Sequence, residues 1–110
     1  MSKYALPRRV PSFYILEGRT PVACRDLIRL YEFVLSERRT IGRANPVPGV
    51  TVSTVFMPFA VAPPGQRPRL FETMVFGGTH DGYQERYATY DEAEAGHAAT
   101  VELVCGGKLQ

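Results

Sequence analysis

The fold is decided by Leu70-Phe71-Glu72-Thr73-Met74-Val75-Phe76-Gly77-Gly78, an apolar stretch that contains a single carboxylate. Its aromatic and apolar residues predict a strand over residues 69–76, and the glycine pair ends it. An unpaired buried charge costs several kcal/mol, so Glu72 must face water or find a partner. We therefore expect Glu72 either to serve a binding site or to pair with Arg69, Arg86 or an arginine of the first helix.

A second long strand is predicted over residues 50–57, because β-branched residues dominate Val50-Thr51-Val52-Ser53-Thr54-Val55-Phe56-Met57. Alternation places Val50, Val52, Thr54 and Phe56 on one face of this strand. The following loop, residues 59–68, contains three prolines and a glycine, which predicts an antiparallel hairpin with the strand over 69–76. Shorter strands are predicted over residues 13–16 and 84–87, and a connector over residues 44–49.

Two helices are predicted around these strands. The first begins at Thr20-Pro21, ends near Arg39 and carries an apolar stripe that consists of Cys24, Leu27, Ile28, Tyr31, Val34 and Leu35. The second begins at the capping box Thr89-Tyr90-Asp91-Glu92 and stops at Gly106-Gly107. Residues 1–110 are thus predicted to form a single α+β domain with an extended tail over residues 1–11. Its small antiparallel sheet, a long hairpin plus short strands, is packed by two helices on one face.

Composition and charge limit the classes of function. The chain of 110 residues is 45% hydrophobic and 22% charged, which is typical of a globular domain. A net charge of +2 is too small to indicate nucleic-acid binding, and no apolar run reaches the roughly 18 residues of a transmembrane helix. The first ten residues lack a signal-peptide core, so we expect a cytoplasmic protein without membrane contact. Cys24 and Cys105 lie on predicted apolar helix faces, which favours buried free thiols.

Residues with catalytic potential are few. His80 and His97 are the only histidines, and neither has another histidine or a cysteine at metal-ligand spacing. We expect His97 to be a structural histidine beside the apolar stripe of the second helix. His80 precedes Asp81 in a glycine-rich turn, and such a pair can orient a catalytic imidazole but is also common in loops. We predict that the chain is not an enzyme and requires neither a metal nor another cofactor.

A ligand-binding site is easier to argue around the strand over residues 69–76. The predicted site consists of seven residues: Arg69, Phe71, Glu72, Asp81, Tyr83, Arg86 and Tyr87. Aromatic rings can stack on a nucleobase, and guanidinium groups can pair with phosphate through two hydrogen bonds. The two carboxylates can accept hydrogen bonds from ribose hydroxyls or an exocyclic amine. In the alternative interpretation Phe71 belongs to the core, the arginines are solvated and the tyrosines cap the sheet edge.

Three segments together resemble a family of small phage and prophage proteins. They are Val52–Phe56, Leu70–Gly78, and Arg86-Tyr87 with the following Asp91–His97, and the resemblance covers about residues 50–105. In that family the first strand typically continues into Leu-Gly-Asp-His, whereas this chain has Met57-Pro58-Phe59. A function tied to that Asp-His pair is therefore not expected. The chain is also similar in size and pattern to Thoeris anti-defence sponges, compact oligomers that sequester cyclic nucleotide signals.

The resemblance implies a phage-encoded, non-catalytic homo-oligomer in the host cytoplasm that sequesters a cyclic ADP-ribose-like or cyclic oligonucleotide signal. One small domain seldom encloses a charged ligand of that size, which favours a site between subunits. Two alternatives stay open. The chain can be an interaction module that inhibits a host or phage protein, or an accessory virion or DNA-associated protein. The latter depends on a cluster of arginines at positions 8, 9, 38, 39 and 43.

Overall fold

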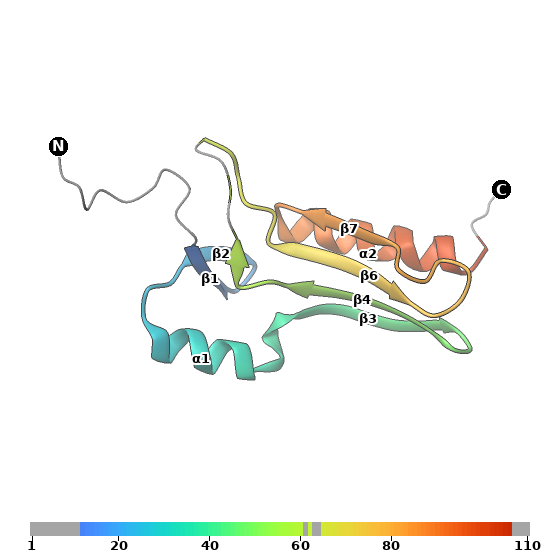
Figure 1. Ribbon diagram of the computed structural model, residues 1–110, viewed down its shortest axis with the longest axis horizontal. Coiled ribbons are helices and arrows are strands. Elements are labelled where there is room, and N and C mark those ends of the chain that lie inside the picture. The colour runs from blue at the N-terminus through green and yellow to red at the C-terminus, as the bar shows by residue number, and fades with distance from the viewer. Residues whose placement is uncertain (1–11, 61, 63–64, 107–110) are drawn as a thin grey trace.

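A computed structural model describes residues 12–60, 62 and 65–106 of the chain. It contains one four-stranded and one three-stranded antiparallel sheet together with two α-helices. The long strands run side by side, α2 lies along them, and α1 lies near one end (Figure 1). The α+β class is therefore confirmed. The tail predicted over residues 1–11 lies outside the described residues.

The four-stranded sheet has the order β3-β4-β6-β7, and every neighbouring pair is antiparallel. Its strands are β3 (Thr40–Val47), β4 (Val50–Phe56), β6 (Phe71–Phe76) and β7 (Gln84–Tyr87). β4 and β6 form the predicted central pair, in which Val52 lies opposite Val75 and Thr54 opposite Thr73. The connector predicted over residues 44–49 is wrong, because β3 continues to Val47. Pro46 is tolerated there because β3 is an edge strand.

The start predicted for the first helix is also wrong. Thr20–Ala23 is strand β2, which pairs with β1 (Ser12–Glu17), and β1 pairs in turn with the short β5 (Phe59–Ala60). Pro21 fits β2 because this strand lies at a sheet edge. The helix α1 spans Leu27–Leu35, and its N-cap is Asp26. A 3₁₀ turn, η1 (Glu37–Arg39), joins α1 to β3.

The second helix, α2 (Tyr90–Val104), begins at the predicted capping box. The Glu92 backbone N–H donates to the Thr89 hydroxyl at 3.1 Å, and the Thr89 backbone N–H donates to the Glu92 carboxylate at 3.1 Å. These bonds lower the pKa of Glu92. A reciprocal cap of this kind satisfies backbone donors that a helix leaves unpaired at its start.

A row of aromatic side chains connects both helices to one face of the sheet. Phe33 of α1 meets Phe56 of β4 edge-on with ring centres 5.6 Å apart, and Phe56 lies 5.2 Å from Phe71 of β6. Phe71 meets Tyr90 of α2 at 5.9 Å. Each such pair contributes about 0.5–1.5 kcal/mol beyond the burial of its area. The prediction of two helices packed on one face is confirmed.

The apolar stripe predicted for the first helix, however, is not buried within the chain. Its five helical members are exposed: Leu27, Ile28, Tyr31, Val34 and Leu35. α1 enters the core through Phe33 and Leu30 instead. Cys24 is buried as predicted. The prediction for Cys105 is wrong, since this residue caps the end of α2 and is exposed.

The remainder of α2 packs on the valines of the central strands. Val50, Val52 and Val75 are buried against Val101 and Val104 of the helix. Neither α1 nor α2, the α-helices among the described residues, combines the length and the hydropathy of a membrane span.

Candidate functional site

The face of the four-stranded sheet turned away from α2 is the candidate functional surface, and we call it the open face. Strand register places the following side chains on it: Arg43, Thr51, Ser53, Val55, Glu72, Met74, Phe76, Gln84 and Arg86. All of these residues are half-buried or exposed, whereas the residues between them on β4 and β6 are buried. The open face is therefore accessible to a ligand along three strands of the sheet and part of β3.

Part of the open face is hollowed. Arg43, Thr51, Ser53 and Phe76 line a space of about 410 Å³ that opens to solvent. Arg43 lies opposite Ser53, and Thr51 lies opposite Phe76, so three neighbouring strands supply the four side chains. The Phe76 residue is 51% exposed, and none of the described residues forms an ion pair with Arg43. The hollow thus combines a cation, two hydroxyls and an accessible aromatic ring.

Glu72 lies on the same face, and its carboxylate is paired. Its Oε2 is 3.2 Å from Nε of Arg86, and it also accepts a hydrogen bond from the side-chain amide of Gln84. Arg86 lies directly opposite Glu72 across the β6–β7 pair, where opposite charges stabilise a sheet by roughly 0.2–1 kcal/mol. The Glu72 side chain is only 13% exposed, whereas that of Arg86 is 51% exposed. Glu72 is therefore a structural partner that orients Arg86, and the guanidinium remains accessible.

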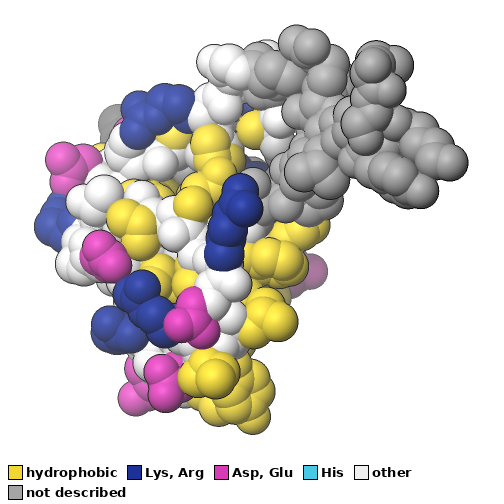
Figure 2. Space-filling view, turned by 90° about the vertical axis from the view of Figure 1, so that its left-hand side faces the viewer, with side chains coloured by type: hydrophobic (Ala, Val, Ile, Leu, Met, Phe, Trp, Pro, Cys, Tyr) yellow, Lys and Arg dark blue, Asp and Glu magenta, His cyan; other side chains and the backbone are white. Residues whose placement is uncertain are grey.

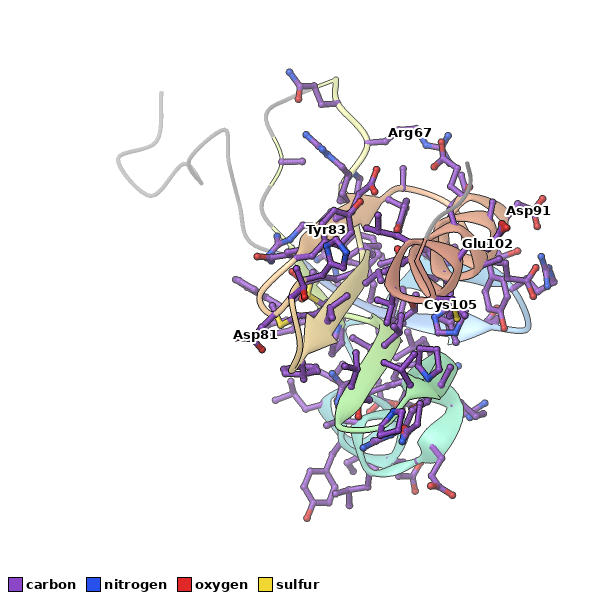
Figure 3. The ribbon with its side chains drawn as sticks, turned by 90° about the vertical axis from the view of Figure 1, so that its right-hand side faces the viewer. Arg67, Asp81, Tyr83, Asp91, Glu102 and Cys105 are labelled. Atoms are coloured by element: carbon purple, nitrogen blue, oxygen red, sulfur yellow. The ribbon has the colours of Figure 1, made fainter. Side chains whose placement is uncertain are left out.

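Asp81 and Tyr83 are occupied by local hydrogen bonds. The Asp81 carboxylate accepts the backbone N–H of Gly77 at 2.6 Å and so closes the turn between β6 and β7. The Tyr83 hydroxyl donates to Glu85 at 2.8 Å, and this bond raises the pKa of Tyr83. Figure 3 shows Asp81 on one side of the sheet and Glu102 of α2 on the other. Neither Asp81 nor Tyr83 lines the hollow, so the predicted site is not gathered in one place.

Two predicted ligand-binding residues, Phe71 and Tyr87, belong to the core. Phe71 is fully buried between Phe56 and Tyr90, so its ring cannot stack on a ligand. Tyr87 is also buried, and its hydroxyl donates to Thr73 at 3.2 Å. The reason is strand alternation, which turns residues 71, 73 and 75 of β6 towards α2 and residues 72, 74 and 76 towards the open face. The accessible ring on β6 is therefore that of Phe76.

A network of hydrogen-bonded side chains, which consists of three buried residues and the half-buried His97, crosses the opposite face of the sheet. Tyr87 donates to Thr73, the Thr73 and Thr54 hydroxyls lie 2.6 Å apart, and Thr54 Oγ1 lies 2.7 Å from Nδ1 of His97. One direction of donation satisfies every member: Tyr87 to Thr73, Thr73 to Thr54, and Thr54 to an unprotonated Nδ1. Burial lowers the pKa of His97, which favours the same neutral ring. We assign this hydrogen-bond network a role in the stability of the fold, which agrees with the structural role predicted for His97.

The surroundings of His80 and Asp81 give little support to a catalytic role for this pair. His80 borders a second hollow of about 380 Å³ near the end of α2, where valines, Leu103 and glycines supply much of the lining. The carboxylate of Asp81 bonds to Gly77, and no hydrogen bond joins it to His80 among the described residues. Within residues 12–60, 62 and 65–106 no three metal-ligating side chains lie together.

The arginines that the sequence grouped together lie in different settings. Arg39 donates to the backbone carbonyl of Phe56 at 3.2 Å, Arg38 stacks over the ring of Phe33, and Arg43 lies on the open face. Positions 8 and 9 lie outside the described residues. Arg69, from the predicted ligand site, is exposed two residues before β6 and does not line the hollow.

Comparison with protein-family models, with curated proteins and with solved structures finds no match. The case for the candidate site therefore rests on the geometry of the structure alone. Sequence reasoning missed Arg43, Thr51, Ser53 and Phe76 as a group. Alternation along the two central strands already separates Thr51, Ser53 and Phe76 from the core residues, so this signal was available. The same argument could not be applied to Arg43, because the strand that contains it was not predicted.

Proposed function

We propose that this chain binds and sequesters a small anionic ligand of the nucleotide type on its open face, without transforming it. The hollow lined by Arg43, Thr51, Ser53 and Phe76 is the observation that carries the proposal. A guanidinium group binds phosphate oxygens through paired, charge-assisted hydrogen bonds, and an exposed aromatic ring stacks on a base. The two hydroxyls are suited to ribose or phosphate oxygens. Arg86, held by Glu72, supplies a second cation on the same face.

A cyclic ADP-ribose-like or cyclic oligonucleotide signal matches these donor groups. A phage-encoded sponge for such a signal is also the role that the sequence resemblance implies. Sequestration requires a dissociation constant near the nanomolar range, or about −12 kcal/mol. An open hollow on one sheet leaves one side of the ligand uncovered, and binding sites of high affinity cover most of a ligand's surface. A second subunit that covers the ligand is therefore part of the proposal.

Isothermal titration calorimetry tests the proposal with a cyclic ADP-ribose isomer and a panel of cyclic dinucleotides. We expect at least one of them to bind. Arg43→Ala should weaken that binding at least about tenfold, because a hydrogen bond to a charged group contributes roughly 1.5–3 kcal/mol. Phe76→Ala should weaken it as well through the loss of stacking. Arg25→Ala is the matched control, because Arg25 is exposed in the loop before α1 and does not line the hollow.

Two outcomes would contradict the proposal. One is the absence of both heat and thermal shift with every nucleotide tested. The other is binding that Arg43→Ala and Phe76→Ala leave unchanged, which would place the ligand elsewhere on the molecule.

An interaction module that blocks another protein is the second candidate, and a separate observation favours it. Phe13 and Phe59 of the three-stranded sheet are 42% and 48% exposed, and their rings lie 5.3 Å apart. Phenylalanine is enriched in the cores of protein interfaces relative to the rest of the surface. Capture of one host or phage protein that Phe59→Ala abolishes, from a chain that binds no nucleotide, would favour this candidate over the first.

A further inference from the structure

The most apolar accessible surface that the structure describes lies on α1. Leu27, Ile28, Tyr31 and Leu35 are 66–72% exposed, and Val34 is 38% exposed. At 3.6 residues per turn these five side chains fall within an arc of about 120° on a nine-residue helix. Figure 2 shows hydrophobic side chains gathered at the end of the molecule where α1 lies. We call this surface the α1 stripe.

The α1 stripe is as large as the largest apolar patches of typical monomers, and patches of that size are often functional. Its five side chains expose roughly 600 Å² of mainly apolar surface, which is the upper limit for the largest patch of a typical monomer. A standard protein interface buries about 800 Å² on each partner. The α1 stripe and its surroundings are therefore close to the area that a stable pair of subunits requires.

The order of residues in the α1 stripe favours a second copy of this chain over an unrelated partner. The exposed apolar positions of α1 mirror each other around Tyr31, since Leu27 corresponds to Leu35 and Ile28 to Val34. A two-fold interface requires a surface that is complementary to itself, because residue i meets residue j and residue j meets residue i. A helix whose apolar positions mirror each other about its midpoint fulfils this requirement.

We propose that α1 packs antiparallel against α1 of a second copy of the chain, about a two-fold axis beside Tyr31. In this arrangement Leu27 lies opposite Leu35 of the partner subunit, and Ile28 lies opposite Val34 of the partner subunit. Each pair joins two aliphatic side chains of similar size, as close packing requires. Phe33 and Leu30 keep their places in the core of their own subunit. This interface is distinct from the contact by which a second subunit would cover the ligand, because Arg43 and Phe76 lie on other elements, and it is tested without ligand.

Sedimentation velocity and light scattering of the full chain, over a micromolar concentration series, test the interface. We expect a species of about twice the 12.3 kDa of one chain. Ile28→Lys should raise the dissociation constant of the dimer at least about tenfold, because it places a charge in an apolar interface. Ala98→Lys is the matched control, since it adds the same charge at an exposed position of α2. Circular dichroism verifies that both variants are folded.

Cysteine cross-linking tests the antiparallel geometry in a Cys105→Ser background, which removes the exposed native thiol. Tyr31→Cys should form a disulfide-linked dimer on its own. Leu27→Cys should cross-link only when mixed with Leu35→Cys, because two copies of residue 27 would lie about 12 Å apart along the helix. A wild-type chain that is monomeric at every concentration would overturn the proposal. The proposal would also be overturned if Ile28→Lys dimerised as strongly as the wild type, or if Leu27→Cys alone cross-linked readily.

Discussion

Replacement of Thr54 by valine should destabilise the protein through two lost hydrogen bonds. The variant keeps a β-branched side chain of similar size on β4 but removes the hydroxyl that joins Thr73 to His97. Thr54 and Thr73 are both fully buried, so water cannot replace the lost partner of Thr73. His97 is only half-buried, and its nitrogen can regain a partner from solvent. The main cost therefore arises at Thr73.

A buried polar group that loses its partner costs about 1–3 kcal/mol, so we expect Thr54→Val to lower the free energy of unfolding by about 2 kcal/mol. For a domain of this size that corresponds to a decrease in Tm of roughly 10 °C. The measurement is urea denaturation followed by circular dichroism at one fixed protein concentration, because any self-association adds to the apparent stability.

Two further variants sharpen this test. Thr51→Val is the matched control, since Thr51 lies on the same strand but faces the open side, and its effect should stay within about 0.5 kcal/mol. Thr54→Val combined with Thr73→Val should cost less than the sum of the two single variants, because each removes the partner of the other. If Thr54→Val is as stable as the wild type, the buried hydroxyl chain contributes nothing and the reasoning fails.

Other predictions follow from single contacts. Burial lowers the pKa of His97, so the unfolded chain binds a proton there more readily, and the free energy of unfolding should fall as the pH drops below the ordinary value of 6.5. Denaturation curves at about pH 7.5 and pH 5.5 should show this loss in the wild type, and His97→Asn should reduce it. Gly96→Ala should unfold at lower denaturant although alanine favours a helix by about 1 kcal/mol, because its Cβ would lie 2.1 Å from the Tyr87 hydroxyl. Tyr87→Phe should not rescue that variant, since Cζ lies at 2.2 Å. A thiol reagent should modify Cys105 in the native protein and Cys24 only after unfolding, and equal rates would contradict the observed burial.

The parts of the fold that the sequence predicts correctly are those in which a local signal agrees with the tertiary packing. The β-branched run over residues 50–57 and the aromatic and apolar run over residues 69–76 identify both central strands, and the Thr89–Glu92 capping box identifies the start of α2. The start of α1 was predicted wrongly because Thr20 and Asp26 are both acceptable N-cap residues. Pairing of β2 with β1 decides between them, and a contact between distant residues cannot be derived from helix propensity.

The candidate site was predicted on the correct strand but partly on its wrong face. Glu72 and Arg86 do share the open face, as their pairing shows. Phe71 does not, because one step along a strand reverses the direction of a side chain. The even-numbered set of β6 contains the charged Glu72, so the odd-numbered set could have been recognised as the core set from the sequence. Arg43 could not be placed on the open face from the sequence, because Pro46 argues against the strand that contains it.

Strand β4 separates the two roles that we assign to this protein, and this separation makes both of them testable in one experiment. Thr54 and Thr51 are chemically identical residues three positions apart, yet one faces α2 and the other faces the hollow. If the assignments hold, Thr54→Val lowers stability and leaves nucleotide affinity unchanged below its unfolding transition. Thr51→Val leaves stability unchanged and weakens the affinity. A single side chain cannot reach both faces of a sheet, so a variant that changed both properties equally would mean that ligand binding and folding are coupled through the strand itself.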